Sequence, residues 1–309
     1  MSFSAEVKEE LCGLGLGTES TLKAQAYGML LFGRAFSAER VCLYTENEKV
    51  AHLYAQVIDA LIGVQVPVER SSDKKEGSRF FVVSVPEAAQ RERVLDCFGH
   101  TVKDIQLRIN RANTEDDEGA AAFLRGVFLA CGTLADPQKE YHLELAVPFR
   151  NLASDLATVL GEYSLTPKTL VRKGGHVLYF KESEQIEDFL TLIHAINASL
   201  SIMNVKIYKD IRNRTNRVTN CDTANISKTV TAAANQVKDI LLIQKRRGLS
   251  SLPEDLQELA ALRLQNQELS LRELGGLLST PLSRSGVNHR LGRIHELAEE
   301  LRRTLSESE

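Results

Sequence analysis

Two apolar segments rich in small residues recur in the first two-thirds of the chain, at residues 26–33 and 123–132. Aligning Gly28 with Gly126 gives a repeat length of 98 residues. Helices with Gly and Ala on one face can approach each other closely, because little side chain separates their backbones. The repeat therefore predicts a pair of helices packed at the junction of two copies, although ordinary core packing explains the same residues.

The segments that follow each of these helices keep the same order. Residues 41–45 and 141–147 alternate between apolar and polar positions, as half-buried strands do. Helical spacing of apolar residues follows at 52–62 in the first copy and at 152–163 in the second. A β-rich run and then a helical run come next in both copies, at 79–85 and 88–98 in the first and at 176–180 and 184–196 in the second.

Each copy is therefore predicted to form a helix, two strands, a helix, two strands and a helix. We predict one α+β domain over residues 1–200, with repeats at about 20–100 and 118–200 related by a pseudo-two-fold axis. The acidic loop 115–118 between the copies is predicted to be a solvated linker.

The C-terminal third is predicted to be all helical. Pro253 can open a first helix that ends near residue 265. Ser270 can cap a second helix, with Glu273 completing a capping box three residues later. Pro281 interrupts the chain, and Ser283 can cap a third helix. The predicted buried positions are Leu256, Leu259, Ala260, Leu264, Leu271, Leu274, Leu277, Leu278, Val287, Leu291 and Ile294.

A short helix, a tight turn and a helix with a polar, basic outer face are typical of a helix-turn-helix, and we assign this domain to residues 231–309. Arg can bind guanine bidentately and Asn can bind adenine, and base contacts come from the start of the recognition helix. A solvated basic helix on an ordinary helical domain is the alternative. The residues predicted to contact bases or phosphates here are Ser270, Ser283, Arg284, Ser285, Asn288, His289, Arg290 and Arg293.

A basic segment, residues 201–230, links the two predicted domains. Between residues 205 and 230, six Lys and Arg stand against two Asp, with several Asn interleaved. The pattern fits phosphate contact and a hydrogen-bonded hinge equally well. A separate helix is predicted to begin near Ala232 and to end at 245–247. The DNA-contacting candidates of the segment are Arg212, Arg214, Asn216, Arg217 and Lys228.

Composition and charge narrow the class of protein. A chain of 309 residues with 43% hydrophobic and 26% charged residues is typical of a soluble protein of about two domains. The net charge of −3 does not favour nucleic acid, but residues 280–295 hold three Arg and no acid, and binding needs only such a local surface.

Metal, cofactor and membrane partners are not expected. Five cysteines without a CxxC pair and seven histidines without ligand spacing predict neither disulfides nor a metal site. The acidic N-terminus lacks the apolar run of a signal peptide, and no apolar stretch reaches the ~18 residues of a membrane span. We predict a cytoplasmic protein without a cofactor.

The duplicated domain resembles the LAGLIDADG homing endonuclease fold, since residues 124–132 align with its nine motif positions. In that fold each motif helix ends in a carboxylate that binds the catalytic metal. Gly33 and Cys131 occupy those positions here, and Arg34 replaces the final glycine of the first motif. Neither Gly33 nor Cys131 supplies the oxygen ligand that Mg²⁺ needs, so the resemblance implies a degenerate domain that is not an enzyme.

A second resemblance covers nearly the whole chain. The opening SFSAEVKEEL at 2–11, FLRG at 123–126, YHLE at 141–144, RKGG at 172–175 and the long run RNRTNRVTNCDTANISKT at 212–229 resemble the WhiA family of bacterial transcription regulators. That family joins a degenerate LAGLIDADG domain to a C-terminal helix-turn-helix. The resemblance implies a nucleoid-associated regulator of cell division, chromosome segregation or sporulation.

The sequence offers three candidate functions. The leading one is a sequence-specific transcription regulator whose partner is double-stranded DNA. An active nuclease is disfavoured by the missing carboxylates. A non-catalytic scaffold or ligand-binding protein stays open, with RNA polymerase or another transcription factor as its partner. A weak likeness of the C-terminal region to the promoter-binding fourth region of sigma factors keeps RNA polymerase among the candidates.

Overall fold

The computed structural model describes residues 2–72, 79–104, 106–172 and 174–306. The chain divides into two compact units, Met1–Lys209 and Asp210–Glu309. Lys173, in the RKGG run, lies outside the described residues. The finer division at residues 200 and 230 stays a prediction.

The first unit contains the predicted duplication. An N-terminal helix, α1 (Phe3–Cys12), precedes it. The first copy consists of α2 (Glu19–Leu31), β1 (Ala35–Phe36), β2 (Val41–Thr45), α3 (Glu48–Ile62), β3 (Val68–Ser72), β4 (Arg79–Ser84) and α4 (Ala88–Cys97). The second consists of α5 (Asp117–Cys131), β5 (Gly132–Leu134), β6 (Leu143–Val147), α6 (Arg150–Glu162), β7 (Lys168–Arg172), β8 (Gly175–Phe180) and α7 (Ser183–Leu192).

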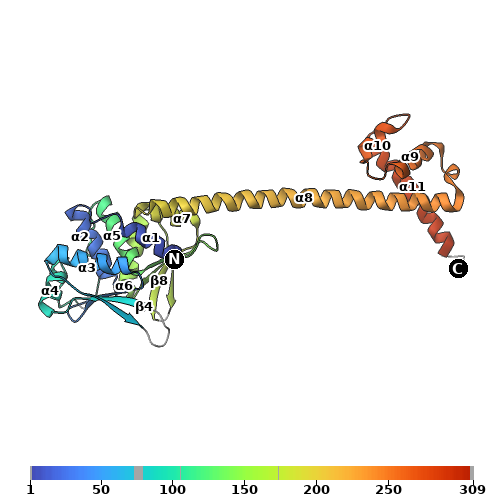
Figure 1. Ribbon diagram of the computed structural model, residues 1–309. Coiled ribbons are helices and arrows are strands. Elements are labelled where there is room, and N and C mark those ends of the chain that lie inside the picture. Colours follow the sequence, from blue (N-terminus) through green and yellow to red (C-terminus); the bar gives the residue numbers. More distant parts are fainter. Residues whose placement is uncertain (1, 73–78, 105, 173, 307–309) are drawn as a thin grey trace. The chain divides into compact units, whose positions relative to one another are not determined.

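Each copy forms a four-stranded antiparallel sheet with the same strand order, β1-β2-β4-β3 and β5-β6-β8-β7. Burial alternates along β6, where Leu143, Leu145 and Val147 lie in the core and the two residues between them do not. The helices pack on the apolar faces, with α2 and α5 side by side (Figure 1). The predicted duplicated α+β fold is confirmed.

The contact between α2 and α5 is reciprocal. A Cβ added to Gly28 would lie 2.2 Å from the Phe123 carbonyl oxygen, and one added to Gly126 would lie 2.1 Å from that of Gln25. Gln25 and Phe123 are themselves 98 residues apart, so each repeat makes the same contact with the other. Only glycine permits this approach, and the repeats are related by a local pseudo-two-fold axis.

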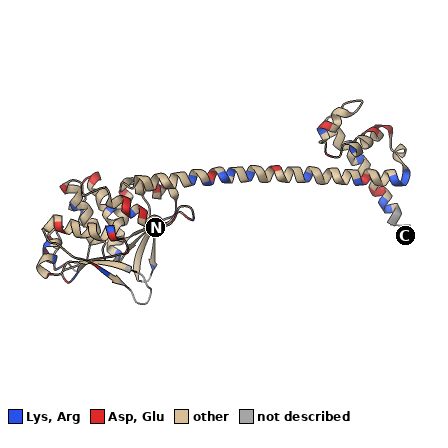
Figure 2. Ribbon diagram, in the orientation of Figure 1, with Lys and Arg blue, Asp and Glu red and all other residues tan. Residues whose placement is uncertain are grey.

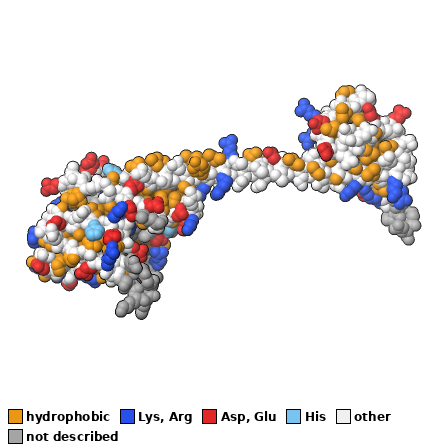
Figure 3. Space-filling view, viewed as in Figure 1, with side chains coloured by type: hydrophobic (Ala, Val, Ile, Leu, Met, Phe, Trp, Pro, Cys, Tyr) orange, Lys and Arg blue, Asp and Glu red, His pale blue; other side chains and the backbone are white. Residues whose placement is uncertain are grey.

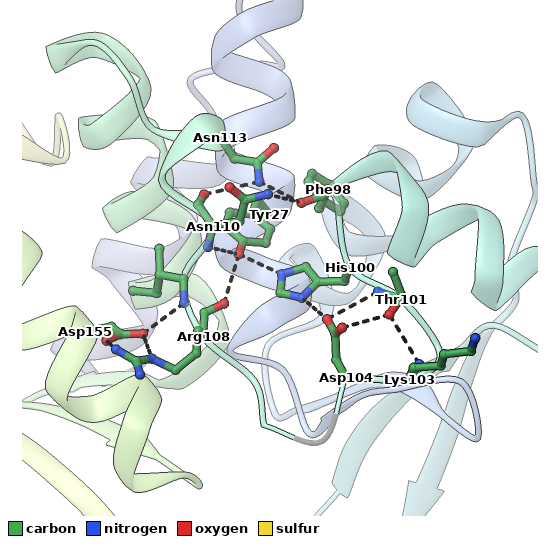
Figure 4. Close-up of polar contacts among 11 residues, drawn as sticks. Tyr27, Phe98, His100, Thr101, Lys103, Asp104, Arg108, Asn110, Asn113 and Asp155 are labelled. Atoms are coloured by element: carbon green, nitrogen blue, oxygen red, sulfur yellow. Dashed lines mark hydrogen bonds and ion pairs between the residues drawn. The ribbon is translucent and has the colours of Figure 1, made fainter.

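A buried polar network joins the connection between the repeats to α2 (Figure 4). The Tyr27 hydroxyl accepts a hydrogen bond from the Asn110 N–H (2.7 Å) and lies 2.9 Å from His100 Nε2. His100 Nδ1 lies 3.1 Å from a carboxylate oxygen of Asp104. Burial raises the pKa of the Tyr27 hydroxyl well above its usual range. The network satisfies polar groups that would otherwise be buried without partners.

The second unit is all helical. Helix α8 (Ile196–Arg247) begins in the first unit and ends in the second, and is followed by a 3₁₀ turn (Leu249–Ser251) and three helices, α9 (Glu254–Gln265), α10 (Leu271–Leu277) and α11 (Arg284–Ser306). A separate apolar core joins them, with Ile240 of α8, Leu256 of α9 and Val287 of α11 fully buried. No helix in the described part of the chain is long and apolar enough to cross a membrane.

Two predictions for this region are wrong. The helix expected to begin near Ala232 begins at Ile196, and the segment 201–230 is helical throughout. Leu277 is 51% exposed rather than buried, whereas Leu274 and Leu278 enter the core. Helix α10 ends at Leu277, and the extended backbone of Leu278 carries that side chain inward instead.

Candidate nucleic-acid interface

Serine side chains fix where the last two helices start. The Ser270 hydroxyl accepts a hydrogen bond from the Glu273 N–H (3.3 Å), and the Glu273 carboxylate accepts one from the Ser270 N–H (2.8 Å). Hydrogen bonding of the Glu273 carboxylate to the Ser270 side chain and to the Ser270 backbone N–H lowers the pKa of Glu273. The Ser283 hydroxyl accepts a hydrogen bond from the Gly286 N–H (3.2 Å) at the start of α11. Both predicted caps are confirmed.

The turn between α10 and α11 contacts both α10 and α9. The Leu282 N–H donates to the Gly275 carbonyl oxygen (3.0 Å). A Cβ on Gly275 would lie 2.3 Å from the Leu282 carbonyl oxygen, so the turn lies directly against the α10 backbone. The Glu258 carboxylate of α9 accepts hydrogen bonds from the Ser279 N–H and hydroxyl (2.7 and 2.8 Å). These contacts fix the direction in which α11 leaves the turn.

The start of α11 opens onto a cavity of about 510 Å³, which we name the basic cavity. Four of its lining residues carry a positive charge, and none of those that the structure describes is Asp or Glu. The lining consists of Lys228, Thr229, Ala232, Ala233 and Gln236 of α8, Arg263 of α9, Ser270, Leu271 and Arg272 at the start of α10, and Arg284 and Asn288 of α11.

The structure thus brings together four of the candidates predicted from sequence: Lys228, Ser270, Arg284 and Asn288. Lys228 comes from the basic segment, and the other three come from the predicted helix-turn-helix. Ser285 and His289 are exposed on α11 but do not line the cavity. In the space-filling view, Lys and Arg side chains of this unit gather at separate places on its surface (Figure 3).

Arg290 and Arg293 have a different environment from Arg284. Arg293 Nη1 lies 2.6 Å from a carboxylate oxygen of Asp255, near the start of α9. Arg290 Nη1 donates a hydrogen bond to the Asp255 backbone carbonyl (2.9 Å). Both arginines therefore tie α11 to α9, and their phosphate contacts stay a prediction.

The remaining candidates lie on the exposed part of α8, where Lys and Arg recur along the helix (Figure 2). Among the residues that the structure describes, none forms a side-chain hydrogen bond or ion pair with Arg212, Arg214, Asn216 or Arg217. None of these four lines the basic cavity. The three arginines therefore have no described counter-ion, and none of the four residues lies at the basic cavity beside α11.

Arg263 is the functional candidate that sequence reasoning missed. It follows Leu256, Leu259 and Ala260 at the spacing of a buried helix face, and it is only 2% exposed. A charged residue at an apolar position of an otherwise regular stripe is the signal that could have revealed it. Burial lowers the pKa of its guanidinium.

The positions Gly33 and Cys131, aligned with the metal-binding positions of the LAGLIDADG motif, provide no carboxylate. Gly33 and Cys131 line a cavity of about 520 Å³ together with Arg34, Arg172 and His176, and no described lining residue is acidic. The Cys131 thiol donates to the Val127 carbonyl oxygen (3.3 Å), and burial raises its pKa to about 12, so it stays protonated. Within the described residues, no group of three or more His, Cys, Asp or Glu could hold a metal ion.

Charge is distributed unevenly between the units. Residues 1–209 carry 23 Lys and Arg against 28 Asp and Glu, a net charge of −5. Residues 210–309 carry 15 against 13, a net charge of +2. The overall negative charge therefore comes from the first unit and does not weigh against nucleic-acid binding by the second.

Comparison with known proteins identifies the family. Residues 120–212 match the WhiA LAGLIDADG-like domain and residues 215–298 match the WhiA C-terminal HTH domain. A protein of Ruminiclostridium cellulolyticum named probable cell division protein WhiA is 38% identical over 98% of this chain and 99% of its own length. This chain belongs to the WhiA family. The WhiA relative of Staphylococcus haemolyticus, with the same name, is 37% identical over 98% of each chain.

The fold agrees with that of a solved WhiA protein. The crystal structure of full-length WhiA from Thermatoga maritima is similar with a TM-score of 0.58 and 25% identity, covering 97% of this chain and 99% of the other. The WhiA family thus accounts for both units, a LAGLIDADG-like domain and a C-terminal HTH domain.

Proposed function

We propose that this protein is a sequence-specific, DNA-binding transcription regulator that acts in cell division. Depending on the bacterial lineage, the process that it regulates also includes chromosome segregation or sporulation. The observation that carries the proposal is the basic cavity. Arg284 and Asn288, at the start of α11, share it with Lys228 and Arg272, and no carboxylate lines it among the described residues. Free cations beside a helix start suit a surface that faces DNA.

In this proposal Arg284 and Asn288 contact base edges, with Ser285 and His289 beside them on the exposed face of α11. Arginine binds guanine through two parallel hydrogen bonds, and asparagine binds adenine in the same way. The relatives' name, probable cell division protein, supports the process that we propose. We expect the protein to work on the nucleoid in the cytoplasm.

We further propose that the first unit performs no catalysis. Metal-dependent phosphodiester cleavage needs oxygen ligands, and Gly33 and a protonated Cys131 offer none. Incubation of plasmid DNA with the protein and Mg²⁺ should therefore give no nicked or linear product. Mg²⁺-dependent cutting that the purified protein retains through repeated chromatography would contradict this part of the proposal.

The test of DNA recognition is chromatin immunoprecipitation with sequencing, in cells that carry the wild type or the Arg284→Ala/Asn288→Ala double variant. Discrete wild-type peaks should vanish in the variant, and each change should weaken operator binding by about 1–3 kcal/mol in vitro. The matched control is Lys238→Ala/Asn235→Ala, which removes one cation and one amide from exposed positions of α8 outside the cavity.

Peaks that persist unchanged in the double variant would overturn the assignment of α11 as the recognition helix. Persistent peaks confined to promoters occupied by RNA polymerase would favour the alternative, a scaffold recruited by the polymerase or by another transcription factor.

A further inference from the structure

The interior of the basic cavity contains a positive charge without a counter-ion. Arg263 Nη1 donates to the Leu269 carbonyl oxygen (2.7 Å) and lies 3.5 Å from that of Gln267. Its Nε is shut off from solvent and has no hydrogen-bond partner among the described residues. No described carboxylate pairs with this guanidinium, which is 2% exposed.

Such an arrangement is unfavourable unless something else enters the cavity. Transfer of a charge from water to a protein interior carries a large penalty, which carbonyl dipoles offset only in part. Lys228, Arg272 and Arg284 line the same cavity and add to its positive potential. The nearby Glu273 carboxylate is already engaged by the Ser270 N–H (2.8 Å).

A second residue that lines the basic cavity also has a buried polar atom without a partner. The Gln236 side-chain oxygen, on the α8 wall, is buried without a hydrogen-bond partner in the described chain. Buried polar groups in folded proteins normally have partners, so two such atoms on residues that line one cavity indicate a site built for a polar occupant. Rotation of the Gln236 amide would present its N–H donors to an anion. The cations around them indicate that this occupant is an anion.

We propose that the basic cavity is a phosphate-binding site in which Arg263, Lys228 and Arg272 hold one phosphate group. The three cations approach from three different helices, which suits an anion whose charge is spread over several oxygens. Guanidinium groups fit phosphate oxygens with directed N–H donors, and the lysine ammonium adds a mobile point charge.

Which molecule supplies the phosphate depends on the proposed function. In a DNA complex it is a backbone phosphate next to the bases that α11 contacts, and it fixes the register of the helix without selecting sequence. A free phosphate-bearing molecule would occupy the same site and compete with DNA. In either case α8, through Lys228, belongs to the binding surface.

The first arm of the test measures DNA binding by the full-length protein. The variant Lys228→Gln/Arg272→Gln removes two exposed cavity cations, and Lys238→Gln removes one exposed cation of α8 outside the cavity. Binding to an operator duplex and to an unrelated duplex is followed over a range of chloride concentrations. The slope of the logarithm of the binding constant against the logarithm of the chloride concentration should be smaller for the double variant, by about 1 for each DNA phosphate that it no longer neutralises. The decrease should be equal for the two duplexes. The control variant should keep the wild-type slope.

The second arm uses inorganic phosphate alone. Replacing chloride by phosphate at constant ionic strength should raise the Tm of the wild type and of Lys238→Gln by more than that of the double variant, whose smaller rise reports the general stabilisation by phosphate. Arg263→Lys, which keeps the charge but removes the directed N–H donors, should also lose the additional rise, which is the specific response to phosphate. If Arg263→Lys does not fold, the exposed double variant still decides the question.

The outcomes separate the two proposals. A lower slope without a response to phosphate assigns the site to the DNA backbone. A response to phosphate in a protein that binds no DNA assigns it to a free phosphate-bearing ligand and overturns the proposed function. Normal DNA binding with an unchanged slope, together with no response to phosphate, overturns the phosphate site and leaves DNA recognition standing.

Discussion

Each unit brings two segments of backbone into contact at a glycine, but the two contacts differ in form. In the first unit the contact is reciprocal, because Gly28 and Gly126 each face the other repeat's backbone. In the second it is single, because Gly275 of α10 faces the turn that leads into α11. The first contact sets the axis of a duplicated scaffold, and the second sets the start of the helix beside the basic cavity. The same residue type thus brings two helices together in the core of one unit and sets the start of α11 in the other.

The reciprocal contact predicts the largest effect. Gly126→Ala places a methyl group 2.1 Å from the Gln25 carbonyl oxygen, so the two helices must separate. Overpacking that displaces backbone should destabilise the first unit by about 3 kcal/mol. Denaturant unfolding followed by far-UV circular dichroism measures this, since the chain has no tryptophan.

Gly161→Ala is the control in the same unit. Gly161 lies in α6 with nothing near its missing Cβ, and alanine there should be neutral or stabilising by about 0.5–1 kcal/mol. If both variants behaved alike, the α2–α5 contact would not be the tight backbone approach described above.

Disrupting the Gly275 contact of the second unit should lower stability less than disrupting the α2–α5 contact, and it should also affect DNA binding. Gly275→Ala places a methyl group against the Leu282 carbonyl oxygen and should destabilise the unit by about 2 kcal/mol and weaken DNA binding. Gly276→Ala, one position later in α10, meets open space and should change neither. Thermal unfolding and operator binding of the pair test this, and weakened binding in both variants would refute it.

Local patterns in the sequence were enough to predict the α2–α5 contact in outline and the starts of α10 and α11. The repeat shows in small residues at matching positions, and the caps of α10 and α11 show in Ser270, Glu273 and Ser283. These features depend on residues a few positions apart, or on the comparison of one repeat with the other. The order of helices and strands followed from the same periodicity.

Features that depend on tertiary contacts or lack an apolar stripe could not be predicted in this way. The middle of α8 is exposed on all sides, so no burial pattern marks it as helical. The buried pair Tyr27–His100 and the ion pair Arg293–Asp255 join residues far apart in the chain. The basic cavity needed the fold as well, because its cations come from four helices.

Ion pairs extend the comparison, since each unit has carboxylates that bind arginine side chains. In the first unit Asp155 of α6 accepts two hydrogen bonds from Arg108 (2.8 and 2.7 Å) and one from the Ile109 N–H (3.0 Å). The hydrogen bonds from Arg108 contribute most to lowering the pKa of Asp155, and the backbone N–H adds to this. Asp155→Asn should destabilise the protein by about 1 kcal/mol at neutral pH.

That effect should depend on pH. The pKa of Asp155 is lower in the folded protein than in the unfolded chain, where it is about 3.9. The stabilisation is therefore complete above the unfolded value and is lost as the pH falls through the folded value. The difference in unfolding free energy between wild type and Asp155→Asn should shrink in strong acid, and a difference that stays constant with pH would refute this role.

The smallest expected effect distinguishes two arginines on one helix. Arg293 lies against Asp255 while Arg284 faces the basic cavity, although both were predicted to contact DNA. The Arg293–Asp255 pair is about two-fifths exposed on each side, so Arg293→Ala should destabilise the second unit by only about 0.5 kcal/mol. Its operator affinity and salt slope should stay close to those of the wild type, whereas Arg284→Ala should lower affinity in a sequence-dependent way. If Arg293→Ala instead lowers the salt slope by about 1, Arg293 leaves Asp255 for a phosphate when DNA binds, and the sequence-based prediction of a phosphate contact is correct.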